Sequence, residues 1–287
     1  ARVFRQTMPN QLMAIPDLQM AFEQYVRQWE GAKPLIPTLN MALDDLLNNV
    51  VQYAFPNDQT EHHIEVEGEV RDTWVIFTIT DDGIPFNPLT VAPPDLSLLL
   101  HEREIGGLGI HLVRSMFDEV SYHRTVGRNV LTVKKQLVSK ASTTMKAPDK
   151  TEIRAFDVER LPLPSHKDPR NIDKSVESCR SGAVMIVTPQ ARFDTNSAPE
   201  VEQILMDHIG QGERQIVLDL SRISYISSIG LRVILKAAMA MTRTDGRVVV
   251  CGGNDHVRTV LQLSGALMMS LYASTLEEAL SKVQELR

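Results

Sequence analysis

A carboxylate and a carboxamide one helical turn apart are the side chains with the clearest chemical potential in this sequence. Asp45, Asn49 and Tyr53 follow one another at intervals of four residues, so in a helix they share one face. A carboxylate can act as a general base, and the side-chain oxygen of Asn is a ligand that hard cations accept. Alone, such residues are more typical of a solvated helix face, so the later motifs decide the interpretation.

Two glycine-containing motifs follow. Asp81-Asp82-Gly83 comes directly after the strand-like run TWVIFTIT, and Gly106, Gly107 and Gly109 open a helix-like segment. A carboxylate at the end of a strand can accept a hydrogen bond from an exocyclic amine, and glycines at a helix start let backbone N–H groups approach phosphates. These glycines follow a long loop rather than a strand, which excludes the dinucleotide-binding fingerprint of a Rossmann fold.

Taken in this order, the three elements resemble the GHKL ATPase family. Asn49 matches its N-box, Asp81-Asp82-Gly83 its first glycine box, and Gly106-Gly107-Leu108-Gly109 its second. The strings DDGIPFNP, GGLGIHLVRSMFDEVSY and GRNVLTV resemble the anti-sigma factor serine kinase branch of that family. The resemblance covers about residues 5–137 and implies a Bergerat-type α/β sandwich, in which helices cover one face of a largely antiparallel sheet.

The same resemblance implies ATP and Mg²⁺ as cofactors. Asn49 would bind Mg²⁺, Asp81 would contact the adenine amine, and a lid over residues 84–105 would close on the nucleotide. The implied nucleotide-binding set is Asn49, Asp81, Gly83, Gly106, Gly107, Leu108 and Gly109.

Asp45 occupies the position of the catalytic base, where the family usually has Glu. Its side chain is one methylene shorter, so we expect the carboxylate to reach less far toward an incoming hydroxyl. Because a misplacement near 1 Å can cost about a hundredfold in rate, the sequence supports ATP binding more firmly than kinase activity.

Ser227 and Ser228 lie between the strand-like run QIVLDL and a helix-like segment. Serines at such a turn are by default helix caps, yet a phosphate there would lie at the positive end of the helix. No GxSxG elbow is present, which disfavours a serine hydrolase. The strings DLSRISYISSIGLRVIL and SGALMMSLYASTLEEAL resemble the STAS domain of anti-sigma factor antagonists over about residues 173–287. This resemblance implies Ser228 as the phosphorylated serine.

The 287 residues suggest two domains. An apolar stripe predicts a helix over 41–55, followed by strands over 63–70 and 73–80, a helix over 108–117 and a strand over 130–135. From residue 183 strands and helices alternate, which is typical of an α/β layer structure with a mixed sheet. The Pro-containing polar segment between these parts has linker composition. We therefore expect a kinase-like domain at 1–137, a linker at 138–172 and a STAS domain at 173–287.

The composition is that of an ordinary globular protein, with 43% hydrophobic and 23% charged residues. A net charge of −6 disfavours direct nucleic-acid binding. The sequence has no apolar run of membrane-spanning length and no signal-peptide core at its start, so we expect a cytoplasmic protein without a membrane association.

These patterns favour a bacterial partner-switching regulator in which a serine kinase is fused to its own STAS substrate and phosphorylates Ser228. A non-catalytic module that binds ATP and sequesters a partner is the alternative. A histidine kinase is disfavoured, because no helical hairpin with a phosphoacceptor His precedes residue 41. The resemblance implies a sigma factor or other regulator, STAS or anti-sigma proteins and a PP2C-type phosphatase as partners, and a homodimer.

Overall fold

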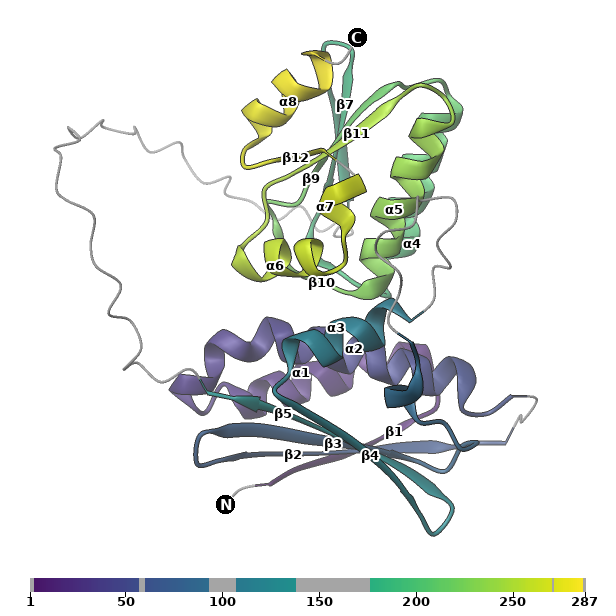
Figure 1. Cartoon of the computed structure of the whole chain (residues 1–287), viewed down its shortest axis with the longest axis vertical. Coiled ribbons are helices and arrows are strands. Elements are labelled where there is room, and N and C mark those ends of the chain that lie inside the picture. Colours follow the sequence, from purple (N-terminus) through teal and green to yellow (C-terminus); the bar gives the residue numbers. More distant parts are fainter. Residues whose placement is uncertain (1–2, 57–59, 93–106, 138–175, 270, 286–287) are drawn as a thin grey trace, which may run out of the picture.

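The computed structural model describes residues 3–56, 60–92, 107–137, 176–269 and 271–285. They form two α/β halves, the C-terminal half resting on the helical face of the N-terminal half (Figure 1). The expected linker 138–172 and most of the expected lid lie outside the described residues, so the proposed domain boundaries stay a prediction.

A five-stranded antiparallel sheet forms the outer layer of the N-terminal half, with the order β1-β2-β3-β5-β4. Among its strands, β2 and β3 alternate buried and more exposed side chains, because one face packs on helices and the other meets solvent. Their bounds are β1 Val3–Pro9, β2 His63–Arg71, β3 Trp74–Asp81, β4 Glu119–Thr125 and β5 Arg128–Gln136.

Three α-helices cover the inner face of this sheet: α1 Ile15–Val26, α2 Ile36–Tyr53 and α3 Leu108–Met116. Short 3-10 turns lie at Leu12–Ala14, Glu30–Leu35 and Pro88–Thr90. Helix α2 begins five residues before the expected start at 41, because Pro37 stands in its first turn, where the fixed φ of proline favours a helix start. Phe22 and Phe77 meet edge to face at 5.9 Å and join α1 to the sheet.

The C-terminal half contains a mixed five-stranded sheet with the order β12-β11-β9-β7-β6, in which only β6 runs antiparallel to its neighbour. Its strands are β6 Val176–Ser181, β7 Val184–Pro189, β9 Gln215–Asp219, β11 Arg247–Cys251 and β12 Leu271–Ala273. Strands β8 Ala191–Phe193 and β10 Ile223–Ile226 form a separate parallel pair. The helices are α4 Ala198–Gly210, α5 Ser228–Thr242, α6 Asp255–Leu263, α7 Ala266–Met269 and α8 Leu276–Glu285.

The two halves share a hydrophobic cluster. Met41 of α2 and Leu108 and Leu112 of α3 belong to the same buried cluster as the core of the C-terminal half. Helices α2 and α3 therefore face the sheet of their own half on one side and the strand–helix turn β10–α5 on the other (Figure 1).

The predicted α/β class, with a largely antiparallel N-terminal sheet and a mixed C-terminal sheet, is confirmed. The α-helices and strands that were not predicted from the sequence are β1, α1, β4, β6, β8, β10 and α7. Within the described ranges, every helix is too short or too polar to cross a lipid bilayer.

Candidate functional site

Helix α2 positions the three residues of the first motif in different surroundings. Asp45 is buried, with 3% of its surface exposed, and its carboxylate faces the C-terminal half. Asn49, one turn later, lines a pocket together with Tyr53, and Tyr53 is 62% exposed. The face of α2 that would by default be solvated is thus covered by the C-terminal half at Asp45 and opens into a pocket at Asn49.

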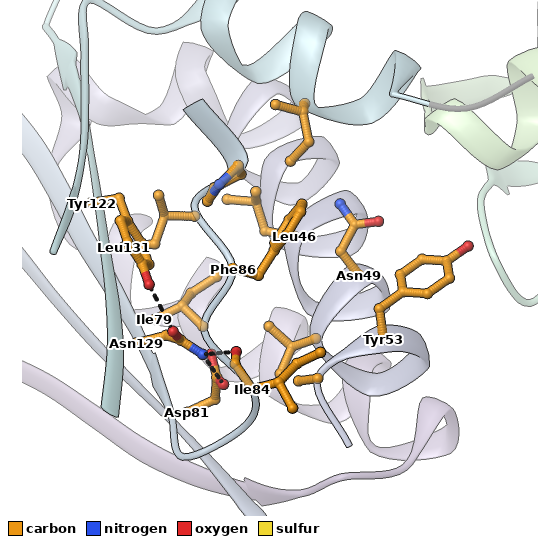
Figure 2. Close-up of a pocket in the computed structure, with 14 residues that line it drawn as sticks. Leu46, Asn49, Tyr53, Ile79, Asp81, Ile84, Phe86, Tyr122, Asn129 and Leu131 are labelled. Atoms are coloured by element: carbon orange, nitrogen blue, oxygen red, sulfur yellow. Dashed lines mark hydrogen bonds between the residues drawn. The ribbon is translucent and has the colours of Figure 1, made fainter. Parts of the chain in front are cut away.

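This pocket has a volume of about 120 Å³ and lies between α2, α3 and the sheet (Figure 2). Its walls are mainly apolar, with polar groups only at particular points, as is typical of sites that enclose a planar ring. The lining residues are Leu46, Asn49, Val50, Tyr53, Ala54, Ile79, Asp81, Ile84, Phe86, Pro88, Ile110, Tyr122, Asn129 and Leu131.

Asp81 provides the carboxylate of the pocket. Its Oδ1 accepts hydrogen bonds from the backbone N–H of Gly83 at 2.9 Å and from Asn129 Nδ2 at 2.7 Å (Figure 2). Burial raises the pKa of Asp81, although the bonds from Asn129 and Gly83 oppose that shift. Both hydrogen bonds recorded for this carboxylate within the described residues use Oδ1, so Oδ2 can accept from a ligand amine.

Gly83 permits a close approach that a side chain would prevent. A Cβ at this position would lie 2.5 Å from both the Cβ and the carbonyl oxygen of Ala54. The adjacent N–H of Ile84 donates to that same carbonyl at 2.8 Å. The turn after β3 is thereby joined to the end of α2, and the two elements close one end of the pocket.

Helix α3 begins at the second glycine box. Gly107 is its N-cap with φ of 74°, a left-handed conformation that glycine adopts without strain. The helix start provides free backbone N–H groups of the kind that bind phosphates. The side chain of Leu108, by contrast, packs in the hydrophobic cluster of the C-terminal half. Gly106 lies outside the described residues.

Gly109 lies where the two halves meet. A Cβ added there would stand 3.0 Å from Cβ and Cγ of Asp45 and 3.1 Å from Oγ of Ser228. The absence of a side chain lets α3, α2 and the start of α5 converge on one point. Apolar walls, the Asp81 carboxylate and this glycine-opened helix are features that an adenine nucleotide site would need, and Gly109 places Asp45 and Ser228 beside the start of α3.

Asp45 and Ser228 are in direct contact across the interface. Ser228 Oγ donates to Asp45 Oδ1 at 2.5 Å, and the backbone N–H of Ser228 donates to the same oxygen at 3.1 Å. The shorter side chain was expected to reach less far toward a hydroxyl, but the structure differs, because the close approach at Gly109 brings the serine to the carboxylate.

Burial raises the pKa of Asp45 to about 6, while the hydrogen bonds from Ser228 and the charge of Arg232 oppose the shift. Oδ2 of Asp45 is buried and has no hydrogen-bond partner among the described residues. A carboxylate that is buried, close to a hydroxyl and of raised pKa can accept a proton near neutral pH.

A second set of contacts between the halves lies beside the Asp45–Ser228 pair and was not predicted from the sequence. Thr195 Oγ1 donates to Asp44 Oδ2 at 3.0 Å and accepts from Asn48 Nδ2 at 2.7 Å. Asp44 is buried with 2% exposure. The signal was available, since Asp44 and Asn48 repeat the four-residue spacing of Asp45 and Asn49. Asn129 was also missed as a site residue, although it lies in the quoted string GRNVLTV.

Comparisons with known proteins match the two halves of the chain to two different families. Residues 8–135 match the family model of the histidine kinase-like ATPase domain, and residues 175–279 match that of the STAS domain. A candidate anti-sigma factor antagonist of Bordetella bronchiseptica, BtrV, is 38% identical over 33% of this chain and 83% of its own length. The serine/threonine-protein kinase BtrW of the same organism is 33% identical over 33% of this chain and 67% of its own length.

A solved structure of a candidate anti-sigma factor antagonist from Thermotoga maritima is also similar, with a TM-score of 0.37 and 23% identity over 38% of this chain and 94% of that one. The architecture is that of the kinase and antagonist components of partner switching joined in one chain. The chain therefore belongs to the histidine kinase-like ATPase family through its N-terminal half and to the STAS family of anti-sigma factor antagonists through its C-terminal half.

Proposed function

We propose that this protein is an ATP-dependent serine kinase whose substrate is Ser228 of its own STAS domain. The observation that carries this proposal is the 2.5 Å hydrogen bond from Ser228 Oγ to Asp45 Oδ1. A hydroxyl held on a buried carboxylate, one helical turn from a residue that lines the pocket, has the arrangement that phosphoryl transfer to serine requires.

The roles of the residues follow from their positions. Bound ATP with Mg²⁺ would supply the γ-phosphoryl group and the cation that neutralises its charge. Asp81 Oδ2 would hold the adenine amine, Asn49 would bind the cation, and the N–H groups at the start of α3 would hold the phosphates. Asp45 would take the proton from Ser228 Oγ while Oγ bonds to phosphorus and the bond from phosphorus to the leaving oxygen of ADP breaks.

Phosphorylation would also change the contact that made it possible. A phosphoserine adds about −1.5 to −2 charges near pH 7, and this charge would stand beside the buried carboxylate of Asp45. Repulsion in a site with little water would separate the two halves. The exposed face of the kinase domain could then bind a sigma factor or another regulator, and a PP2C-type phosphatase would be needed to restore the docked state. A homodimer and a cytoplasmic location also remain proposals from the family resemblance.

Phosphopeptide mass spectrometry of the full chain after incubation with Mg·ATP tests the proposal. We expect phosphate on Ser228 and its loss in the Ser228→Ala variant. Ser227→Ala is the matched control, because Ser227 is also buried but has no hydrogen bond to Asp45 in the described structure. Phosphate only on Ser227, or none on the turn, would contradict the assignment.

The non-catalytic module remains a second candidate, and one observation favours it. The bond from the backbone N–H of Ser228 to Asp45 is a helix-capping interaction that involves no chemistry. In that case ATP would change only the conformation, and Asp45 would serve only to dock α5. This second candidate would be supported if no residue carried phosphate after incubation with Mg·ATP and if Ser228→Ala bound a partner as the wild type does.

A further inference from the structure

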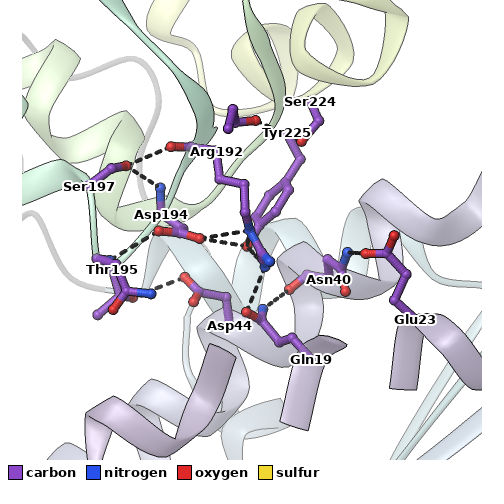
Figure 3. Close-up of polar contacts among 12 residues, drawn as sticks. Gln19, Glu23, Asn40, Asp44, Arg192, Asp194, Thr195, Ser197, Ser224 and Tyr225 are labelled. Carbon is purple, nitrogen blue, oxygen red and sulfur yellow. Dashed lines mark hydrogen bonds and ion pairs between the residues drawn. The ribbon is translucent and has the colours of Figure 1, made fainter. Parts of the chain in front are cut away.

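Polar contacts outside the proposed chemistry join the two halves around Ser228. Arg192 of β8 reaches α1, where its Nη2 donates to Oε1 of Gln19 at 2.7 Å (Figure 3). On the other side of the turn, Thr195 is bound to Asp44 and Asn48 of α2. These contacts involve neither the residues of the pocket nor the Ser228 hydroxyl. They therefore affect which STAS surface binds to the N-terminal half and how that surface is placed.

Arg192 is held in position by its own half of the protein. Its guanidinium bonds the hydroxyl of Tyr225 through Nε at 3.1 Å and Nη2 at 2.5 Å, and it forms an ion pair with Asp194 at 3.0 Å. The guanidinium carbon also lies 4.8 Å from the centre of the Tyr225 ring, within the range of a cation–π contact. A side chain fixed in this way loses little freedom when it binds across the interface.

Gln19 is fixed equally well on the other side. Its Nε2 donates to the backbone carbonyl of Asn40 at 2.8 Å, and the side chain of Asn40 donates to Glu23 at 2.8 Å (Figure 3). The amide of Gln19 therefore has its oxygen, an acceptor, directed at Arg192. Gln19 is 1% exposed, so an oxygen left without a donor there would be costly.

We propose that Arg192 and Thr195 are specificity-determining positioning residues, through which the kinase half selects the STAS domain of its own chain and excludes separate STAS proteins. This inference rests on the proposed kinase function. An incoming STAS surface without these two donors would leave Gln19 Oε1 and Asp44 unpaired in a buried interface, and such a mismatch discriminates between partners. The attached domain is in addition joined covalently to the N-terminal half, so it competes with separate STAS proteins at the effective concentration that a covalent link provides.

Mixing two full-length variants tests this inference, because the same substitution should act in opposite directions in the two chains. The donor chain carries Ser228→Ala and has no acceptor of its own. The acceptor chain carries Asp45→Asn, Gln19→Met and Asp44→Ala, so it has no base and lacks the groups that bind Arg192 and Thr195 of its own STAS domain. Arg192→Met in the donor chain should loosen its self-docked STAS domain and raise transfer to the acceptor about tenfold. The same change in the acceptor chain should lower transfer about 10- to 100-fold, the worth of a hydrogen bond to a charged group.

The opposite signs separate positioning from a folding defect, which would not raise transfer in either chain. Thr195→Val should change phosphate transfer in the same directions but by a smaller factor, because it removes a neutral hydrogen bond and keeps the shape of the side chain. Arg180→Met is the matched control, because Arg180 forms its ion pair with Glu213 inside the C-terminal half. Changes of the same sign in both chains, or none in either chain, would overturn the inference.

Hydrogen exchange without ATP distinguishes a failure of this inference from a failure of the kinase proposal. In the full chain, Arg192→Met and Thr195→Val should increase exchange in α2 and at the start of α5, whereas Arg180→Met should not. If no mixture transfers phosphate, the exchange result decides: increased exchange supports the selective contact, and unchanged exchange overturns it.

Discussion

Oδ1 of Asp45 accepts both the hydroxyl and the backbone N–H of Ser228, at 2.5 and 3.1 Å. One carboxylate oxygen from the N-terminal half thus contacts the proposed acceptor atom and caps the helix that carries it. Substitutions at Asp45 should separate these two effects, because capping needs only an acceptor whereas catalysis needs a base.

Asp45→Asn should keep the domains docked but reduce phosphorylation of Ser228 by about a hundredfold to ten-thousandfold, the usual contribution of a general base. The amide oxygen can still accept from the N–H of Ser228, but it cannot take up a proton. Time courses of phosphate incorporation by the full chain measure the loss. Near-wild-type rates in Asp45→Asn would remove the base role.

Asp45→Glu should lower the rate rather than raise it, although Glu is the usual residue in the family. The Asp carboxylate already touches Ser228, and Gly109 leaves no spare room beside it. An added methylene would push the acceptor hydroxyl away, as overpacking does in other tightly filled sites. A higher rate in Asp45→Glu would show that the interface relaxes and that the docked geometry is not the reactive one.

Gly109→Ala should slow phosphorylation about tenfold by moving Asp45 and Ser228 apart by a few tenths of an ångström, because transfer rates depend steeply on such placement. The added Cβ would stand 3.0 Å from Asp45 and 3.1 Å from Ser228 Oγ. Gly210→Ala is the control, since a Cβ there meets nothing within 4 Å. The prediction fails if Gly109→Ala phosphorylates Ser228 at the rate of Gly210→Ala.

Asp81→Asn should weaken ATP binding by about 1.5–3 kcal/mol, the worth of a hydrogen bond to a charged group. The Asn oxygen can still accept from Gly83 and Asn129, so the turn after β3 should hold, but the amide nitrogen that replaces Oδ2 cannot accept from an amine. Calorimetric titration with ATP measures the change. Asp82→Asn, at a half-exposed neighbouring carboxylate, should bind ATP as the wild type does, and equal losses in both variants would contradict the role of Asp81.

Docking of the two halves should weaken as the pH rises from about 6.5 to 8.5. Burial raises the pKa of Asp44 to about 8, with the charges of Asp45 and Asp194 adding to the shift, and that of Asp45 to about 6. Separated halves expose both carboxylates, whose ordinary pKa is about 3.9, so docking takes up protons and is favoured at the lower pH.

The pH effect should be partly offset in more acidic solution. His256 lies 3.2 Å from Thr38 across the interface, and burial lowers its pKa to about 4. A histidine that is neutral only when docked opposes docking as the pH falls below about 6.5. The protons taken up by Asp44 and Asp45 on docking outweigh the one that His256 gives up. Small-angle X-ray scattering of the full chain should therefore find it steadily more compact as the pH falls from about 8.5 to about 5, with a smaller slope below about pH 6.5 than the aspartates alone would give. Asp44→Asn should remove most of the change above pH 6.5, and an unchanged slope in that variant would contradict the assignment.

The sequence allowed the main elements to be predicted where one pattern dominated locally. The apolar stripe of α2 and the strand–helix alternation after residue 183 are such patterns, and the bounds of these elements agree within a few residues. Strand β4 was missed because only Val120 and Tyr122 among its seven residues are apolar or aromatic, too few to give a clear alternating pattern. Its place in the sheet depends on long-range pairing with β5, which no local window contains.

The site was predicted in its motifs but not in its contacts. Asp45 and Ser228 were each identified from their own segments, yet 183 positions separate them, and only the docking of the two halves brings them together. Arg192 carried no local signal at all, because its role comes from Tyr225 on a neighbouring strand and Gln19 on a helix of the other half. Contacts of this kind depend on tertiary packing rather than on spacing.

The shared cluster of Met41, Leu108 and Leu112 with the C-terminal core has a consequence for temperature. Separating the halves transfers these apolar side chains into water, so the opening has a positive heat capacity change. Attraction of this origin weakens on cooling. The docked state is therefore held less firmly in the cold, and the population of open molecules depends on temperature even where no nucleotide is bound and no serine is modified.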